Sequence, residues 1–501
     1  MQLLLQILSA VLAIILSKLI HNFIWVPRKI QLHFLKQGIT GPGYHPVISN
    51  TSEIISLISK SLSKPIPLNH DILQRAIPFY HLWSGMYGKT FVYWFGSTPR
   101  LAVSDPGLVK EVLTNSSGAF EKIGLNPSAQ LLIGGGLVAL NGDKWALHRR
   151  IANQAFKSYF AWVPEAVAST EKMLERWEIE RGGREEFELE VSREFHTLTA
   201  DIISRTAFGN SFEDGKTIFE NQEKLIALTN IALRSVYIPT FRYWPTAKNR
   251  ERWRLNKEII KSTKKLIDID SDKGYSKNLL SLLRLPHKNQ EGREEMLGVE
   301  DIINECKTFY IAGKETSGNF LSWALLCLAM HQDWQGMARE EIARVCKGKK
   351  APTAEDLNDL KLVALIINET LRLYPPAVMI TRNVVKDVKL GNVDIPAGAQ
   401  VYLPMTAVHH DPEIWGEDAQ NFNPWRFNEP RKHLGAFFPF GLGPRICVGQ
   451  NLAMVEAKVA LVMIIKHYSF EVSPTYLHAP MQLLTLQPQH GVQIILRRIV
   501  D

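Results

Sequence analysis

The sequence FFPFGLGPRICVGQNLA, from Phe437 to Ala453, sets one cysteine among glycines, prolines and an arginine and is the most informative segment about the fold. Cys447 directly precedes a hydrophobic, helix-forming segment, so backbone N–H groups at the start of that helix would point at a thiolate there. Glycines let the backbone pass close to a flat ligand, and Arg445 can meet an acidic group on it. The segment matches the pattern F-x-x-G-x-R-x-C-x-G at Phe440, Gly443, Arg445, Cys447 and Gly449.

The composition excludes several classes of protein. The chain has 501 residues, of which 46% are hydrophobic and 22% charged, as in ordinary globular proteins. Its four cysteines have neither the spacing of a disulfide framework nor a C-x-x-C pair, which favours a reducing compartment. The 58 Lys and Arg against 50 Asp and Glu are scattered, without a long basic run, so no nucleic-acid binding is expected. A basic face suits a membrane surface or an acidic protein partner better.

The amino terminus is strongly apolar from Leu3 to Leu16, and positive residues follow it at Lys18, Arg28 and Lys29. A cleaved signal peptide is the alternative, but it would carry its charge before the apolar run and a small-residue cleavage site after it. With the apolar residues that follow, the run reaches about 20 residues, enough to cross a bilayer. Downstream positive charge would hold the rest of the chain in the cytosol. We therefore predict a membrane signal-anchor helix over residues 1–26.

The remainder divides into a basic, Gly/Pro-rich hinge at 27–50 and one domain at 51–501. Apolar, β-branched segments predict a hairpin at 90–105, turning at Gly-Ser-Thr-Pro, and further strands at 388–404. Helical periodicity occurs at 166–180, 198–209 and 362–376. The charged segment 268–278 is expected to be a surface loop. The predicted class is mainly α with small β-sheets (α+β).

The motif ETLR places Glu369 and Arg372 in an apolar helix, where the pair would be at least partly buried. A buried guanidinium has five donors, more than one carboxylate can satisfy. Arg426, in NPWRF, is a candidate third member. These three residues are predicted to form a structural network that holds the cysteine loop in place.

The segment AGKETS lies in a long apolar helix, where Ala312 and Gly313 thin one face. The Thr316 hydroxyl can turn to a backbone carbonyl and open a groove for water. With Glu315 beside it, the pair is similar to a proton-delivery relay. The alternative is a kinked buried helix with Lys314 and Glu315 exposed to solvent.

In WALHRR, Trp145 and Arg149 are four residues apart and share a helical face. Arg149 could pair there with a second carboxylate of the ligand. By itself this spacing has little specificity, and its meaning depends on the other motifs.

Taken together and in this order, the motifs resemble the cytochrome P-450 superfamily of haem-thiolate mono-oxygenases, from about Trp25 to the end of the chain. The chain is similar to the plant microsomal branch that includes brassinosteroid-inactivating hydroxylases and other isoprenoid oxidases. The stretches that carry this likeness are 36–44, 143–156, 198–209 and 429–453. One departure is Ser317, where the family often has a second threonine; the hydroxyl is kept. The resemblance implies the cytochrome P-450 fold preceded by the anchor helix.

The resemblance also implies the roles of the site residues. Cys447 would be the axial ligand of haem b (iron protoporphyrin IX), whose thiolate favours O–O cleavage. Glu315 and Thr316 would deliver protons to the activated oxygen. The remaining cofactor contacts would come from Arg445, Trp145, Arg149, Arg382, Phe440, Gly441 and Gly449. His409 and His410 could suggest a metal site, but they lie in a loop that this family commonly has.

The implied function is insertion of one oxygen atom from O2 into a C–H bond of a lipophilic steroid or terpenoid. Electrons would come from NADPH through NADPH–cytochrome P-450 reductase, at the endoplasmic reticulum membrane, with the catalytic domain in the cytosol. A fatty-acid hydroxylase is an alternative, but it would need a cationic group to bind the carboxylate of its substrate. In the expected contact segments, only Arg234 is evident as such a group. A haem-thiolate isomerase or dehydratase needs no reductase and commonly lacks the Glu315–Thr316 pair; a haem sensor is a third possibility. Substrate contacts are expected in 126–136, 225–241, 377–380 and 483–484.

Overall fold

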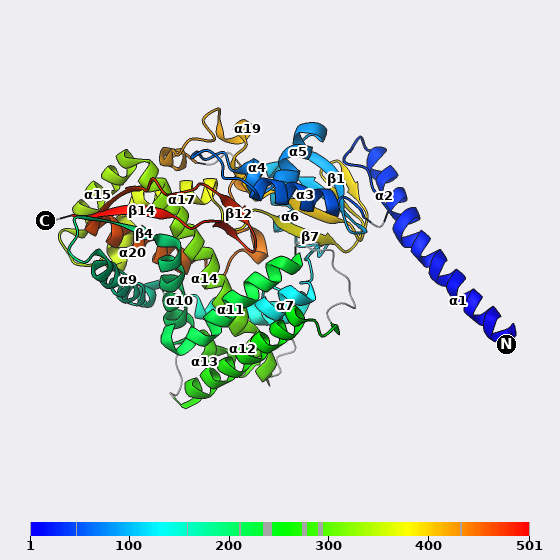
Figure 1. Cartoon of the computed structure of the whole chain (residues 1–501), viewed down its shortest axis with the longest axis horizontal. Helices are drawn as coiled ribbons and strands as arrows, with labels where there is room; N and C mark the ends of the chain where they lie inside the picture. The colour runs from blue at the N-terminus through cyan, green and yellow to red at the C-terminus, as the bar shows by residue number, and fades with distance from the viewer. Residues whose placement is uncertain are drawn as a thin grey trace.

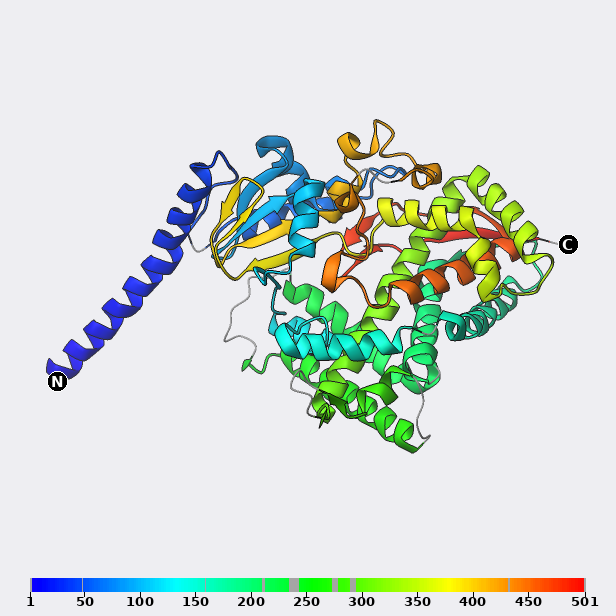
Figure 2. The same ribbon diagram turned by 180° about the vertical axis from the view of Figure 1, so that it is seen from behind.

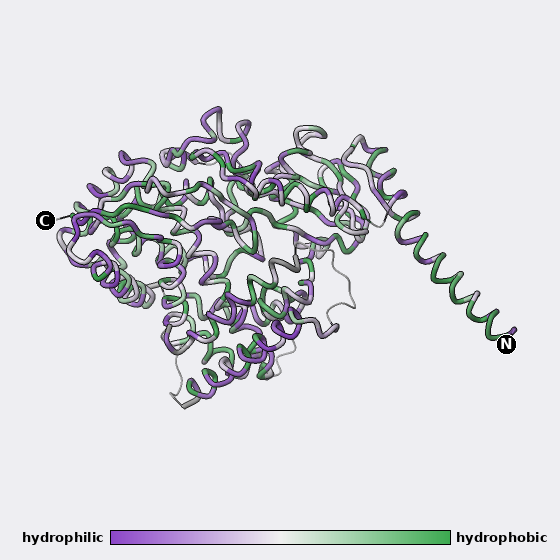
Figure 3. Tube along the Cα trace, in the orientation of Figure 1, coloured by the Kyte–Doolittle hydropathy of each residue, from purple (hydrophilic) through white to green (hydrophobic). Residues whose placement is uncertain are grey.

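The apolar N-terminus forms a helix that stands away from the rest of the protein (Figure 1). The structure, a computed structural model, describes residues 2–46, 48–157, 159–209, 212–233, 243–272, 278–288, 294–430 and 433–499. Helix α1 (Gln2–Ile20) has no buried residue, and Figure 3 shows it as almost continuously hydrophobic. A helix with this length and composition can cross a membrane, since its apolar window has a mean hydropathy of 2.4.

The end of this helix differs from the prediction. The anchor was expected to end at residue 26, but a π-helical turn (His21–Trp25) leads directly into α2 (Val26–Leu35). A proline inside an α-helix would clash with the carbonyl four residues earlier. The wider turn just before Pro27 relieves that clash, so the helix continues. Pro27 and Phe34 are buried, which attaches the base of the helix to the body.

The glycine- and proline-rich segment after α2 lies against a sheet. The Val92 N–H donates to the Thr40 carbonyl at 3.0 Å. Gly41 is required next to it, because a Cβ there would lie 1.9 Å from the Val92 oxygen. The expected hinge is thus helical in its first part and fixed to a strand in its second.

That sheet contains the predicted hairpin. Its turn is confined to Gly96 and Ser97, and Pro99 of the expected turn lies instead in a strand, opposite Trp94. Among the described residues the sheet has the order β1-β2-β10-β7-β3. Its strands are β1 (Thr90–Phe95), β2 (Thr98–Val103), β10 (Gln400–Leu403), β7 (Ile380–Val384) and β3 (Phe120–Lys122).

The strands predicted at 388–404 are confirmed as β8, β9 and β10. A second sheet pairs β11 and β4 with β14, and the remaining strands form two-stranded pairs. Their bounds are β4 (Glu186–Glu190), β5 (His287–Lys288), β6 (Glu294–Glu295), β8 (Val388–Leu390), β9 (Val393–Ile395), β11 (Tyr468–Val472), β12 (Pro480–Gln482), β13 (Leu486–Pro488) and β14 (Gln493–Arg498).

Helices make up most of the body (Figure 2), as predicted. The three periodic segments are α9 (Tyr159–Arg181), α10 (Val191–Phe208) and α17 (Lys361–Leu373). Helix α14 (Val299–Met330) is buried over most of its length and packs along α10. Other helices are α3 (Thr51–Leu62), α4 (Leu73–Ala76), α5 (Pro78–Tyr87), α6 (Pro106–Thr114), α7 (Pro127–Ile133), α8 (Gly142–Ala155), α11 (Phe212–Leu233), α12 (Ala247–Asp272), α13 (Leu279–Leu283), α15 (Gln332–Cys346), α16 (Ala354–Asp359), α18 (Met405–His409), α19 (Pro412–Trp415) and α20 (Gln450–His467).

The surface loop predicted at 268–278 is wrong in its first half. Helix α12 continues to Asp272, and 273–277 lie outside the described residues. Asp270 is buried because it accepts hydrogen bonds from the Ser281 hydroxyl and the Arg284 guanidinium, each at 3.1 Å. The charge pattern of the segment did not reveal these partners, which lie beyond its end.

Candidate active site

A cavity of about 560 Å³ lies where α14, α8, β3, β7 and the cysteine loop meet. Thr316 lines it, and so does every residue predicted to contact the cofactor; Glu315 does not. The polar and small lining residues are Lys122, Trp145, Arg149, Thr308, Ala312, Gly313, Thr316, Ser317, Ala377, Thr381, Arg382, Gly441, Arg445, Cys447, Gly449, Ala453 and Glu456.

The loop before α20 directs the thiol of Cys447 into this cavity. The Cys447 N–H donates to the Phe440 carbonyl at 2.8 Å, which closes the loop. Gly443 has φ +68° and lies against α6, where a Cβ would be 2.4 Å from the Leu113 oxygen, so only glycine fits. Burial raises the pKa of the thiol, while the N–H groups of Gly449 and Gln450 and two nearby cations act in the opposite direction. The N–H groups expected at the start of the helix therefore do face the sulfur.

Four cations line the cavity: Lys122, Arg149, Arg382 and Arg445. Their hydrogen bonds go to neutral acceptors; Arg445, for example, donates to the Leu140 carbonyl at 2.7 Å. Burial, and then the nearby Arg382 and Arg445, lower the pKa of Lys122 to about 8. Burial and Arg445 lower that of Arg382 to about 10. This part of the cavity therefore suits a ligand with carboxylate groups.

Trp145 has a more specific contact than its spacing predicted. The Arg445 guanidinium lies over its ring, 4.2 Å from the centroid. Arg445 also donates to Asn141 Oδ1 at 2.7 Å, just before α8. The tryptophan thus holds the arginine of the cysteine loop, while Arg149 joins the same loop through the Ile446 carbonyl at 2.5 Å.

The Thr316 hydroxyl donates to the Ala312 carbonyl at 2.7 Å, the geometry predicted for it. Glycine at position 313 also allows close helix packing, because a Cβ there would lie 2.7 Å from the Ile203 side chain on α10. Its small size lets two helices approach closely. Ser317, which also lines the cavity, donates to the carboxyl group of Glu456 on α20.

Glu315 and Thr316 face different sides of α14, because consecutive helical residues are about 100° apart. Glu315 lines a separate hollow, where its carboxylate lies 3.6 Å from His196 Nδ1. The alternative of an exposed Lys314 and Glu315 is wrong, since both are buried and Lys314 forms an ion pair with Glu223. The structure does not bring the predicted acid and hydroxyl together.

The comparisons with known proteins agree with this geometry. A family profile described as Cytochrome P450 matches residues 62–495. The chain belongs to the cytochrome P450 family. It is 43% identical to Cytochrome P450 734A1 of Arabidopsis thaliana, over 99% of this chain and 97% of the relative. It is 42% identical to Cytochrome P450 734A6 of Oryza sativa subsp. japonica, over 94% of this chain and 92% of the relative. It is 38% identical to Cytochrome P450 CYP749A22 of Panax ginseng, over 99% of this chain and 97% of the relative.

Cytochromes P450 are haem-thiolate mono-oxygenases, and the residues of the cavity fit a haem. Cys447 alone of the four cysteines faces the cavity; the other three are buried. Among the described residues the four cations have no carboxylate partner at hydrogen-bonding distance, so they would meet the two propionates. The family and its plant branch, both expected from the sequence motifs, are confirmed.

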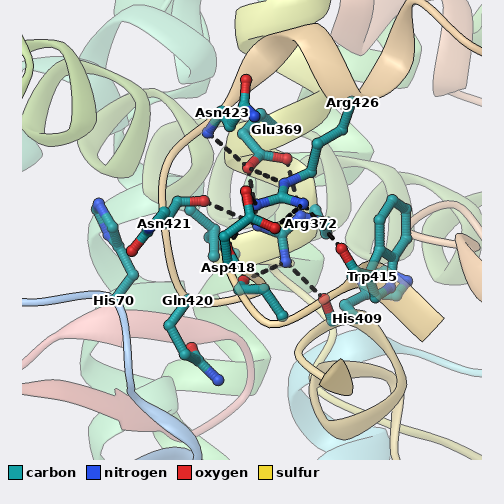
Figure 4. A network of polar contacts seen from close by, with 12 residues as sticks. His70, Glu369, Arg372, His409, Trp415, Asp418, Gln420, Asn421, Asn423 and Arg426 are labelled. Atoms are coloured by element: carbon teal, nitrogen blue, oxygen red, sulfur yellow. Dashed lines mark hydrogen bonds and ion pairs between the residues drawn. The ribbon is translucent and has the colours of Figure 1, made fainter. Parts of the chain in front are cut away.

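The P450 motif ETLR forms the predicted network with Arg426 (Figure 4). Glu369 and Arg372 are fully buried, and all five guanidinium donors of Arg372 have acceptors. Two of these donors form hydrogen bonds with the Glu369 carboxylate, at 2.7 and 2.8 Å. The other three donate to the carbonyls of His409, Ala419 and Asn421. Arg426 lies 3.4 Å from Glu369 but donates its hydrogen bonds to Asp418 and the Trp415 carbonyl.

His409 connects this network to the cysteine loop. Its carbonyl accepts from Arg372, and its Nε2 accepts from the Phe438 N–H at 3.1 Å. His410 is bonded to the Leu373 carbonyl at 2.8 Å. Both histidines are buried structural residues, and the described part of the chain holds no group of three side chains suited to a metal ion.

Two charged residues of the cavity, Lys122 and Glu456, were not predicted from the sequence. Lys122 pairs with Arg382 across β3 and β7, a register that no local motif encodes. Glu456 is buried, and burial raises its pKa to about 8, so it is largely protonated at neutral pH. A signal for Glu456 did exist, since a carboxylate inside the apolar run AMVEAKVALVMII needs a partner.

The predicted substrate segments reach the cavity only in part. Ala377, Met379 and Ile380 line it, whereas Leu483 and Leu484 do not. Residues 126–136 and 225–229 do not line it, and residues 234–241, Arg234 included, are outside the described residues. The apolar lining comes mainly from Leu125, Leu137, Val138, Phe156, Ile203, Phe309 and Phe320.

Proposed function

We propose that this cytochrome P450 inserts one oxygen atom from O2 into a C–H bond of a steroid or terpenoid. Its electrons come from NADPH through NADPH–cytochrome P450 reductase. The observation that carries the proposal is one largely apolar cavity that contains the thiol of Cys447, four cations and the hydroxyl of Thr316. Apolar walls suit a rigid hydrocarbon skeleton, at about 25 cal/mol per Å² of buried surface.

Bound haem would supply the activation of oxygen. The Cys447 thiolate would hold it and donate electron density, with the Gly449 and Gln450 N–H groups stabilising the sulfur charge. The Thr316 Oγ1 donates to Ala312 and so presents its lone pairs to water, which positions a proton in the cavity. Phe309 and Phe320 exclude bulk water around the reacting C–H bond.

Thr316→Ala should keep haem and substrate binding but lower the product formed per NADPH at least about ten-fold, because the water that the hydroxyl positions as a proton donor is lost. The missing product should be replaced by hydrogen peroxide. A matched control is Ser322→Ala, since the Ser322 hydroxyl makes the same bond to the carbonyl four residues earlier, away from the cavity. Equal coupling in Thr316→Ala and the parent protein would contradict the proton-positioning role.

The substrate class is tested by titrating the purified protein with a steroid, a triterpenoid, a diterpenoid and a fatty acid while following the haem absorption band. We expect the steroid or a terpenoid to bind and turn over. Turnover of the fatty acid alone would favour a fatty-acid hydroxylase. Conversion without NADPH and reductase would indicate an isomerase or dehydratase, and binding without any conversion a sensor.

We also propose that the protein is a single-pass protein of the endoplasmic reticulum membrane, with α1 in the lipid and the catalytic domain in the cytosol. The exposed apolar surface of α1 and the positive residues after it support this orientation. Protease added to sealed microsomes should digest the catalytic domain. Full protection of that domain would show the opposite orientation.

A further inference from the structure

A second cavity, of about 770 Å³, lies between α7, α12 and the first turns of α14. It is separate from the active site, because the end of α7 presses against α14. Gly134 marks the contact, since a Cβ there would lie 2.7 Å from the Asn304 oxygen, and Thr308 donates to the Ile133 carbonyl at 2.9 Å. Thr308 lines the active site, whereas its neighbour Lys307 lines the second cavity.

Two buried cations line this second cavity, and neither has a carboxylate partner among the described residues. Lys307 is 3% exposed and donates to Asn256 Oδ1 at 2.7 Å. Arg252 is 6% exposed and donates to Asn249 Oδ1 and the Leu228 carbonyl, each at 2.7 Å, while its Nε has no acceptor. The groups that accept hydrogen bonds from Lys307 and Arg252 are therefore all neutral.

Two other buried cations of the chain are paired with carboxylates. Lys314, two turns further along α14, pairs with Glu223, and Arg372 pairs with Glu369. A buried cation without an anion is costly. Burial alone lowers the pKa of Lys307 to about 8 and also lowers that of Arg252. The same cavity includes the exposed Lys264 and the exposed Glu300, so positive groups still predominate.

We propose that this cavity is a binding site for a lipophilic carboxylic acid, whose carboxylate meets Lys307 and Arg252. Leu131, Ile260 and Ile303 in the lining would contact its apolar part. A cavity of about 770 Å³ is in the usual range for small organic ligands. The site does not depend on which compound is oxidised in the active site.

The test uses the full-length haem protein with the active site blocked by a saturating phenylimidazole bound at the haem. Calorimetry then measures binding of laurate and of dodecanol, which has the same chain without the charge. Laurate should bind the parent protein at least about ten-fold more tightly than dodecanol, the usual contribution of a charged hydrogen bond. Lys307→Met should remove that difference, and Arg252→Gln should reduce it.

Lys257→Met is the matched control, because Lys257 is an exposed lysine of α12 outside the cavity, and this variant should keep the full preference for laurate. The proposal is overturned by absent laurate binding in the parent protein, by equal affinity for laurate and dodecanol, or by an unchanged preference in both cavity variants. Because the active site is blocked, these outcomes are independent of whether a steroid or terpenoid is oxidised.

Discussion

Cys447→Ser should abolish the ferrous–CO absorption that is typical of a thiolate-ligated haem. The sulfur of Cys447 faces the cavity, with the N–H groups of Gly449 and Gln450 directed at it, and a serine hydroxyl cannot replace the thiolate. The loss should be complete, because no other cysteine lines this cavity. The measurement is the difference spectrum of the reduced protein with and without carbon monoxide.

The other three cysteines serve as controls for this spectrum. Cys306, Cys327 and Cys346 are buried, and burial raises the pKa of each thiol, so they behave as small apolar residues. Cys306→Ala, Cys327→Ala and Cys346→Ala should each retain the thiolate spectrum. An unchanged spectrum in Cys447→Ser would rule out the proposed ligand.

Glu369→Gln should destabilise the protein by about 3–5 kcal/mol, because it leaves the buried charge of Arg372 without its partner. The pair has 0% exposed side-chain surface on both residues. A loss of that size is a large part of the roughly 5–15 kcal/mol that holds a typical protein folded. Urea unfolding followed by circular dichroism should show the lower midpoint. Haem content should fall as well, since the network reaches the cysteine loop through His409.

Glu251→Gln is the matched control for Glu369→Gln. Glu251 pairs with Arg254 at the same spacing of three residues, 2.6 Å apart, but on the surface of α12. Water solvates both charges when the surface pair is broken, so the unfolding midpoint should not change. Equal midpoints for the two variants would show that the buried network does not stabilise the cysteine loop.

Local patterns were sufficient for much of this fold. The periodic segments became α9, α10 and α17, and the alternating apolar segments became the hairpin and β8 to β10. Both kinds of pattern record which face of an element is buried, and that information lies within a few residues. The prediction failed where partners were distant. Asp270 looked solvent-exposed because two of the groups that bond it, on Ser281 and Arg284, lie outside the charged segment.

The candidate site likewise combines features that follow from local sequence with features that depend on distant partners. Local sequence was enough to predict the position of Cys447, the turns around it and the apolar N-terminal helix, because glycine conformation, helix start and hydrophobic length are local properties. Which charges come together, by contrast, depends on how the elements pack in the folded protein. Packing sets Lys122 opposite Arg382 and turns Glu315 away from Thr316. It also brings Lys307 and Arg252 into one cavity, where neither has a carboxylate partner among the described residues. These pairings depend on how separate elements pack, and electrostatic energy depends on the resulting distances and burial, which no single segment encodes.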